Sequence, residues 1–362
     1  MASGVARRPI KDFQKYIHQL ESFQSESRGF IRIAINRIKA RNKTSSTPKV
    51  IFPEGAALKI LKALNTLVPE KIMEPVLIGE EKVIQNLIEK HHLLTLKDIK
   101  IIQPERQSNF KKYAEEFYKM KKSKGVTLKE AQKLMARPNY YASMAVHLKD
   151  KDALVTGATD NFRNSVIPVL RTIGTGKRHL LAGVNLVLLK NRILFFADTA
   201  VNINPTAEQI AHITLYTAQM VRHLNMEPRA ALLSFVSFSE RQEENPKKLR
   251  EALQIIKKQD PQLKIEGEVQ ADIAVNEGLA QEIFPKFSYK QGANVLIFPN
   301  LDSGNIAYKL VQQLGSGEVI GPLLVGIKKP ANILQRTCSV EDVINTSVLT
   351  ALKVHVSRDL SK

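Results

Sequence analysis

Short, continuous apolar runs constrain the fold of this sequence more than any other feature. Eight such runs recur along the chain, at residues 50–53, 76–79, 99–103, 153–157, 193–198, 230–235, 295–299 and 322–327. They do not show the apolar–polar alternation of a strand that has one face in water. Runs of this kind predict strands that are covered on both faces, so we expect a mostly parallel sheet between helices.

Residues with helical spacing fill the intervals between these runs. A helix is expected over residues 56–68, directly after Glu54 and Gly55. Asn204 and Pro205 predict the start of another helix, as an N-cap residue and a proline at the first helical position. The alternation of the two patterns predicts an α/β protein built from βα units.

The charge and the composition of the chain indicate which kinds of binding partner to expect. Lys and Arg number 54 against 35 Asp and Glu, which gives a formal net charge of +19. A positive field of this size attracts polyanions, although lysines on solvated faces would give the same total. The chain has no Trp, and no aromatic residues are interleaved with a basic stripe, so we expect no nucleic-acid partner. No apolar run reaches the roughly 18 residues that a membrane span needs, so we expect no membrane partner.

The single cysteine, Cys338, bears on the compartment. One cysteine cannot form a disulfide framework or a cysteine zinc site. The first residues also lack the apolar core of a secretory signal. Both observations favour a cytoplasmic protein.

Several strands are followed by polar or glycine-rich turns, at residues 156–160, 197–199 and 299–305. Ligands of open α/β sheets bind beyond the carboxyl ends of the strands, although such turns also serve simply as helix caps. We find no phosphate-binding P-loop, no dinucleotide fingerprint, no nucleophile elbow and no histidine spacing suited to a metal. The sequence therefore predicts neither a metal nor a bound cofactor.

Two long segments resemble the phosphate acetyltransferase/butyryltransferase family. Residues 291–310 read QGANVLIFPNLDSGNIAYKL, and residues 320–342 carry GPLLVG, KP and CSVED in the family's order. Residues 196–208 and 266–272 add shorter matches, and the resemblance extends over roughly residues 46–355.

This resemblance implies a two-domain α/β fold similar to isocitrate and isopropylmalate dehydrogenases, with mostly parallel sheets and an interdomain cleft. Domain I would be discontinuous, with residues 46–178 and 326–362, and domain II would span residues 179–325. Residues 1–45 would form a helical extension and linker. The implied reaction converts acetyl-CoA and phosphate into acetyl phosphate and CoA. The implied partners are these two substrates and further copies of the chain, in a homodimer or a higher homo-oligomer.

The resemblance also implies roles for three neighbouring residues. Asp342 aligns with the family's general base, which would take the proton of the CoA thiol. Arg336 aligns with the arginine beside the catalytic serine, and a guanidinium suits phosphate because it donates two parallel hydrogen bonds. Gln335 replaces that serine, and its amide could donate to an oxyanion. The residues alone allow plainer interpretations, since Ser339 and Asp342 match a capping box and Arg336 could form a surface ion pair.

Other positions complete the predicted site or depart from the family. Lys121 stands where the family has an arginine, and it keeps the charge without the two-pronged geometry. Ile167 replaces a second arginine, and Arg163, one helical turn earlier, is expected to reach the same region. Ser303 and Asn305 are predicted to contact the substrate from the signature stretch.

The N-terminus suggests an alternative function. Residues 2–10, with Asp12 and Tyr16, are similar to the junction that precedes the acetyltransferase-like domain of bifunctional malic enzymes. The chain would then be a catalytically weak, acetyl-CoA-binding regulatory or assembly module. A dehydrogenase of the same fold is a weaker alternative, because no dinucleotide fingerprint supports it.

Overall fold

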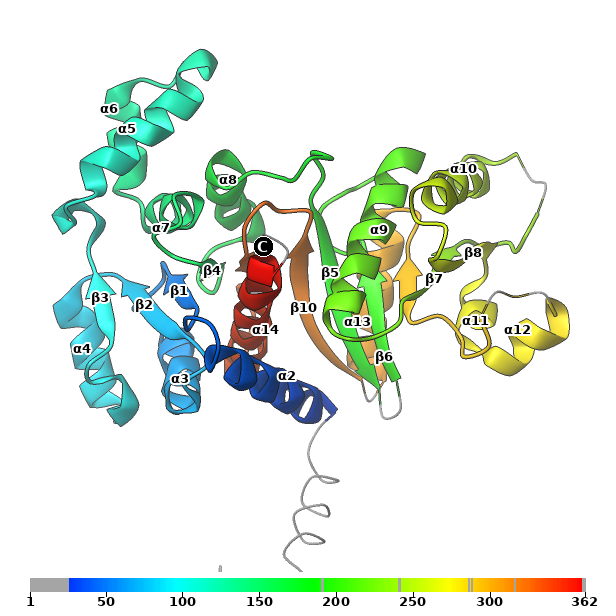
Figure 1. Cartoon of the computed structure of the whole chain (residues 1–362), viewed down its shortest axis with the longest axis horizontal. Coiled ribbons are helices and arrows are strands. Elements are labelled where there is room, and N and C mark those ends of the chain that lie inside the picture. Colours follow the sequence, from blue (N-terminus) through cyan, green and yellow to red (C-terminus); the bar gives the residue numbers. More distant parts are fainter. Residues whose placement is uncertain are drawn as a thin grey trace, which may run out of the picture.

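Two β-sheets, each covered by helices, organise the chain (Figure 1). The structure is a computed structural model that describes residues 26–189, 192–239, 242–285, 287, 289–315 and 317–359. The strands are β1 (Lys49–Phe52), β2 (Glu74–Ile78), β3 (Lys100–Ile102), β4 (Ala153–Thr156), β5 (Ala182–Leu189), β6 (Arg192–Ala197), β7 (Arg229–Leu233), β8 (Lys264–Val269), β9 (Val295–Ile297), β10 (Glu318–Val325) and β11 (Ala331–Ile333). The helices are α2 (Glu26–Asn42), α3 (Leu58–Leu67), α4 (Glu81–Lys90), α5 (Phe110–Lys121), α6 (Leu128–Met135), α7 (Pro138–His147), α8 (Phe162–Thr172), α9 (Ala207–His223), α10 (Glu244–Gln259), α11 (Ala271–Val275), α12 (Glu277–Ile283), α13 (Leu301–Leu314) and α14 (Val340–Asp359).

The first sheet has the strand order β11-β4-β1-β2-β3, and its neighbouring strands are parallel throughout. Strands β1 and β4 bury almost every side chain, as expected for strands with helices on both faces. The chain moves outward from β1 to β2 and β3, then returns to place β4 on the other side of β1. This reversal between β1 and β4 is the position at which open α/β sheets bind ligands.

The second sheet has the order β10-β5-β6-β9-β7-β8. Strands β6, β9, β7 and β8 pair in parallel, whereas β5 pairs antiparallel with both β10 and β6. Pro322 lies in the edge strand β10, where the register shifts between Ile320 and Leu323. A proline is tolerated there because one side of an edge strand donates no ladder hydrogen bonds. The predicted α/β class with mostly parallel sheets is confirmed.

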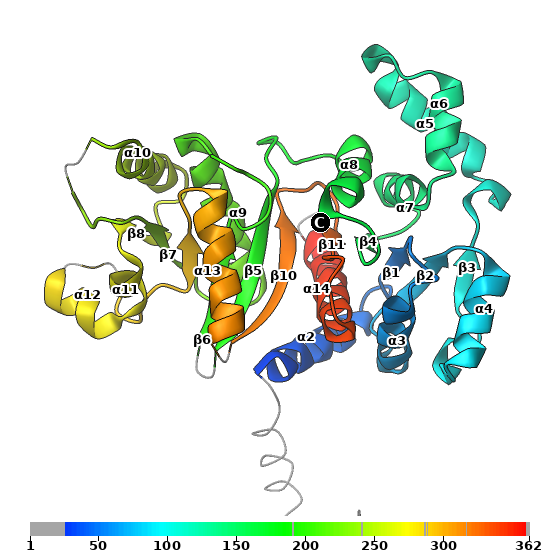
Figure 2. The ribbon, with the colours of Figure 1, turned by 180° about the vertical axis from the view of Figure 1, so that it is seen from behind.

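Helix α14 connects the two sheets. It packs against β4 and β11 of the first sheet, β10 of the second, and α2 and α3. Figures 1 and 2 show it standing between the sheets, with α9 and α13 on opposite faces of the second sheet. Helix α14 therefore contacts both halves of the molecule. Its two ends also border different cavities.

All eight predicted strands are present as β1–β4, β6, β7, β9 and β10, and three further strands, β5, β8 and β11, were missed. The predicted start of α9 was wrong. Thr206, rather than Asn204, is the N-cap, and Pro205 precedes the helix. The Thr206 hydroxyl accepts from the Gln209 N–H, while the Gln209 side chain accepts from the Thr206 N–H at 2.9 Å. This capping box satisfies two backbone donors, whereas Asn204 accepts from Lys248.

Residues 1–25 of the expected N-terminal extension lie outside the described residues, and α2 covers residues 26–42. Among the helices that the structure describes, none combines the length and the apolar character that crossing a bilayer requires.

Candidate active site

The carboxylate of Glu54 holds the two loops at the reversal of the first sheet together. Glu54 follows β1, and its side chain accepts hydrogen bonds from the backbone N–H groups of Gly157, Ala158 and Thr159 at 2.8–2.9 Å. The Thr159 hydroxyl adds a fourth bond at 2.7 Å. These bonds fix the loop after β4 against the loop after β1, and they form a rigid floor for a ligand site.

A cavity of about 770 Å³ lies beside this floor. It is lined by the loops after β1, β2 and β4, by the start of α7 and by one face of α8. Arg137 is the cation among its described lining residues, and Glu54 and Asp160 are the acids. Ile167, which is 37% exposed, also lines this cavity. An arginine at this position would therefore project into an open, polar space.

A second cavity, of about 400 Å³, lies between α13 of the second sheet and the segment that leads from β11 into α14. Gln335, Thr337, Cys338 and Asp342 line one side of it, and Tyr308 with its neighbours on α13 lines the other. We call this space the α13–α14 cavity. It brings together two of the three residues predicted to be catalytic.

Asp342 both caps α14 and borders this cavity. Its Oδ2 atom accepts from the Ser339 N–H and from the Ser339 hydroxyl, each at 2.8 Å, and the Asp342 N–H donates back to that hydroxyl at 3.1 Å. The capping box that the sequence allowed is therefore present. Within the described residues, these bonds use Oδ2 and leave Oδ1 unengaged, so a capping carboxylate can still offer one oxygen to a ligand.

Gln335 and Arg336 sit on the loop between β11 and α14. The Gln335 amide donates to the Tyr308 hydroxyl at 3.3 Å, which ties this loop to α13. Arg336 is exposed, and it is not among the residues that line the α13–α14 cavity. Its carbonyl oxygen accepts from the Lys59 ammonium at 2.8 Å, and the Cys338 carbonyl accepts from the same ammonium at 3.2 Å. Lys59 thus holds the backbone of the loop.

Cys338 lines the same cavity as a half-buried thiol. Burial raises its pKa, and the neighbouring Lys59 only partly offsets that effect. A thiol with a raised pKa is a poor nucleophile near neutral pH. The raised pKa therefore disfavours Cys338 as a nucleophile in the α13–α14 cavity.

The remaining predicted contacts lie away from both cavities. Ser303 belongs to the first turn of α13, where it bonds to Asn300, and the Asn305 amide donates to the Thr199 carbonyl. Arg163 is exposed on the first turn of α8. Lys121 ends α5, and burial, followed by the charges of Lys124 and Arg171, lowers its pKa. The roles of these four residues in binding substrate remain predictions.

Three residues that hold the site together were missed from the sequence. Tyr308 lies inside the family-like stretch 291–310, so the stretch itself could have indicated it. Glu54 directly follows an expected strand, which is a common place for a functional carboxylate. Lys59 meets Arg336 across 277 positions of sequence, and no local pattern indicates that contact.

Comparison with known proteins adds an independent line of evidence. The sequence model of the phosphate acetyl/butaryl transferase family matches residues 33–351. The phosphate acetyltransferase of Synechocystis is 36% identical over 345 residues, which cover 95% of this chain and 49% of that protein. The NADP-dependent malic enzyme of Escherichia coli is 33% identical over 358 residues, covering 98% of this chain and 46% of that enzyme.

A solved structure agrees with these matches. The phosphotransacetylase from Streptococcus pyogenes superposes with a TM-score of 0.81 and 34% identity, over 86% of this chain and 94% of that one. The chain spans about half the length of the two curated relatives.

Proposed function

Because the chain belongs to the phosphate acetyl/butaryl transferase family, we propose that it transfers an acetyl group between CoA and phosphate. The observation that carries this proposal is the α13–α14 cavity, which gathers Asp342 and Gln335 at the junction of the two sheets. The cations Lys59, Arg336 and Lys309 are at or near this cavity and would favour the anionic substrates.

In the proposed reaction, Asp342 takes the proton from the CoA thiol through Oδ1. A thiol with a pKa near 8.5 is mostly protonated at neutral pH, so a base within reach raises the thiolate fraction during attack. The thiolate attacks the acetyl carbonyl of acetyl phosphate, the carbon–sulfur bond forms, and phosphate leaves with the former bridging oxygen. The Gln335 amide donates to the developing oxyanion, and Arg336 pairs with the phosphate.

A second candidate function is an acetyl-CoA-binding regulatory module. Three points favour it: the Asp342 carboxylate is engaged by Ser339, the family resemblance implies an arginine where this chain has Ile167, and a malic enzyme matches almost the whole chain. In this case acetyl-CoA would occupy the α13–α14 cavity without turnover.

The proposal includes an assembly and a location. Ile306, Leu310 and Leu314 are 56%, 52% and 83% exposed and recur every four residues along α13. An apolar stripe of this kind is typical of a contact between subunits, so we propose a homodimer or higher homo-oligomer that buries it.

We also propose a cytoplasmic location for the protein. We further propose a division into two domains, one with residues 46–178 and 326–362 and the other with residues 179–325.

Thioester formation tests the main proposal. The purified chain, acetyl phosphate and CoA are mixed, and thioester absorbance is followed against a buffer control. Turnover supports the transferase. A rate equal to the control excludes it, and calorimetric binding of acetyl-CoA without turnover then supports the regulatory module. Absence of both turnover and binding contradicts both functions.

A further inference from the structure

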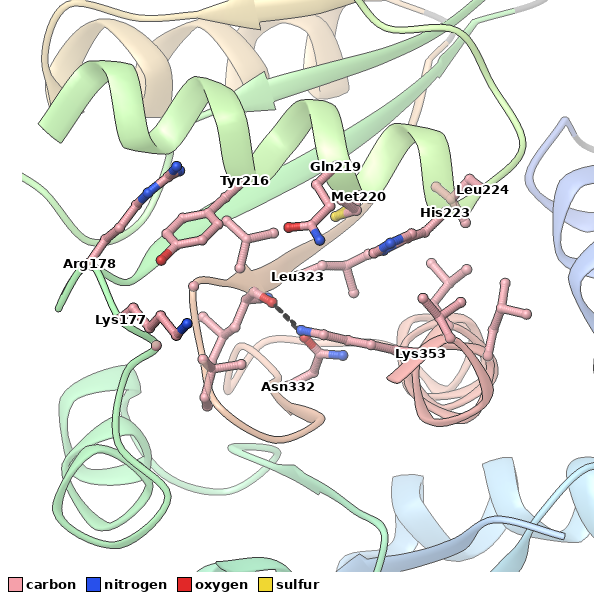
Figure 3. A pocket seen from close by; sticks show the side chains of 18 residues that line it. Lys177, Arg178, Tyr216, Gln219, Met220, His223, Leu224, Leu323, Asn332 and Lys353 are labelled. Carbon is pink, nitrogen blue, oxygen red and sulfur yellow. Dashed lines mark hydrogen bonds between the residues drawn. The ribbon is translucent and has the colours of Figure 1, made fainter. Parts of the chain in front are cut away.

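A third cavity, of about 430 Å³, lies between α9, β10 and the second half of α14 (Figure 3). Residues 176–178, from the segment between α8 and β5, close one end of it. The α13–α14 cavity borders the opposite face of the second sheet and shares no lining residue with this one. We call the third space the α9 cavity, and neither proposed function uses it.

The α9 cavity is positively charged. Lys353, Lys177 and Arg178 line it, and its described lining residues include no Asp or Glu. His223 also lines it, but burial lowers the pKa of this imidazole. Figure 3 shows the Lys353 side chain reaching from α14 toward the Leu324 carbonyl, to which it donates at 2.7 Å. An ammonium enclosed by protein is costly unless an anion balances its charge. This cavity therefore favours an anionic occupant.

The wall around Lys353 is largely apolar. Apolar side chains of β10, α9 and α14 line the same cavity as the ammonium: Leu323, Met220, Leu349, Leu352 and Val356. Tyr216 adds an aromatic face, over which the Arg178 guanidinium lies at 5.6 Å from the ring centre. Its size is within the range of small-molecule sites, roughly 300–1,000 Å³. An occupant must therefore bring both an apolar body and a charged group.

The burial of the Lys353 ammonium favours one class of anion over another. A singly charged carboxylate costs less to remove from water than a doubly charged phosphate, and it can accept the N–H donors that Leu324 leaves unused. We propose that the α9 cavity binds a small organic carboxylic acid, with its carboxylate on Lys353 and its apolar body against Leu323, Leu352 and Tyr216. A second acid group on such a ligand would meet Lys177 and Arg178.

Calorimetric titration of the full chain with hexanoate tests this proposal. Hexanamide is the uncharged control of the same shape, and inorganic phosphate tests the other anion. We expect hexanoate to bind, and hexanamide to bind about 10- to 100-fold more weakly, which is the usual value of hydrogen bonds to a charged group. Lys353→Met should weaken hexanoate to the same extent, while Lys258→Met, an exposed site on α10, should not.

A second variant keeps the test independent of Lys353. Met220→Trp fills the cavity and should abolish hexanoate binding, with folding of both variants checked by circular dichroism. Absent hexanoate binding, or binding that Lys353→Met and Met220→Trp leave unchanged, overturns the proposal. Phosphate binding that depends on Lys353 and exceeds that of hexanoate overturns the choice of a carboxylate. None of these outcomes involves acetyl transfer, so the proposed function stands or falls separately.

Discussion

The Glu54 carboxylate accepts a hydrogen bond from the Gly157 N–H at 2.8 Å, across the reversal between β1 and β4. Two further backbone N–H groups and one hydroxyl complete its partners. A carboxylate thus occupies a ring of donors that resembles an anion-binding nest. These hydrogen bonds lie within the chain, so the floor of the cavity of about 770 Å³ is formed without a bound substrate.

Replacing Glu54 with Gln should destabilise the protein. The amide NH₂ would face backbone N–H groups that need an acceptor, at a cost of about 1–3 kcal/mol per unsatisfied donor. Urea unfolding measures the loss. Glu89→Gln, at an exposed position on α4, is the control and should leave the free energy of unfolding nearly unchanged. Equal stability of the two variants would mean that the Glu54 bonds contribute nothing net.

The two roles of Asp342 can be separated by a pair of variants. Asp342→Asn removes the base and should lower turnover by about 10²–10⁴, with a small effect on stability because an amide oxygen can still cap. Ser339→Ala removes the N-cap and should cost about 1 kcal/mol of stability, with a much smaller effect on turnover. Thioester assays and thermal unfolding of both variants give the comparison. If Asp342→Asn loses only stability, Asp342 is a cap and not a base.

Ile167→Arg should strengthen phosphate binding. The new guanidinium would project into the cavity of about 770 Å³, and one bidentate phosphate contact is worth roughly 10- to 100-fold in affinity. The measurement is calorimetric titration of each variant with inorganic phosphate. Leu170→Arg is a matched control, because Leu170 lies on the same helix with the same exposure of 37% but does not line that cavity. A similar change in both variants would reflect overall charge instead.

Lys353 should make stability depend on pH. Burial lowers its pKa from 10.5 to about 8, so between these two pH values the unfolded state binds more protons than the native state. Stability contributed by this residue therefore rises with pH from about 8 to about 10.5, by about 3 kcal/mol. The titratable groups that share its cavity are Lys177 and Arg178 at the mouth and His223 on α9, which is neutral in this range because burial lowers its pKa.

Urea unfolding across this pH range measures the effect. Lys353→Met should remove the rise and stabilise the protein at pH 7, while Lys258→Met should retain the wild-type profile. Parallel profiles for wild type and Lys353→Met would show that the ammonium is well solvated.

The apolar stripe on α13 predicts the effect of charge on assembly. Leu310→Glu together with Leu314→Glu should convert the proposed oligomer into monomers, because burying two carboxylates without cationic partners is costly. Light scattering after gel filtration measures the mass. Gln281→Glu, at an exposed position on α12, should not change it. Wild-type protein that is already monomeric contradicts the proposed assembly.

The regular part of the fold could be predicted because strands covered on both faces are apolar throughout. Strand β5 largely follows this rule and was missed all the same, whereas the other two missed strands break it. Strand β11 has only three residues and includes the buried Asn332, whose amide bonds to Thr350. Strand β8 carries the buried Glu268, whose carboxylate pairs with Arg250 at 3.0 Å and accepts from the Ser239 N–H at 2.8 Å. Their partners are distant in sequence, so composition alone could not show that these polar residues are compensated.

The part of the candidate site that lies in one short segment, residues 335–342, could be predicted from the sequence. Gln335, Arg336 and Asp342 are close in sequence, and Gln335 and Asp342 do border one cavity. The sequence could not show that Tyr308 receives the Gln335 amide or that Lys59 fixes the loop, because folding alone creates both contacts. The sequence also could not show how two residues of α8 differ. Arg163 is exposed and lines neither cavity of the candidate site, whereas Ile167 lines the cavity of about 770 Å³.

Helix α14 contributes Asp342 and Thr346 to one cavity, and Leu349, Leu352 and Lys353 to another. A helix of 20 residues is about 30 Å long and is stiff along its axis. Asp342 and Lys353 are eleven residues apart on this helix, which is about 16 Å along its axis. One stiff element therefore fixes the spacing between a carboxylate at one cavity and an ammonium at the other.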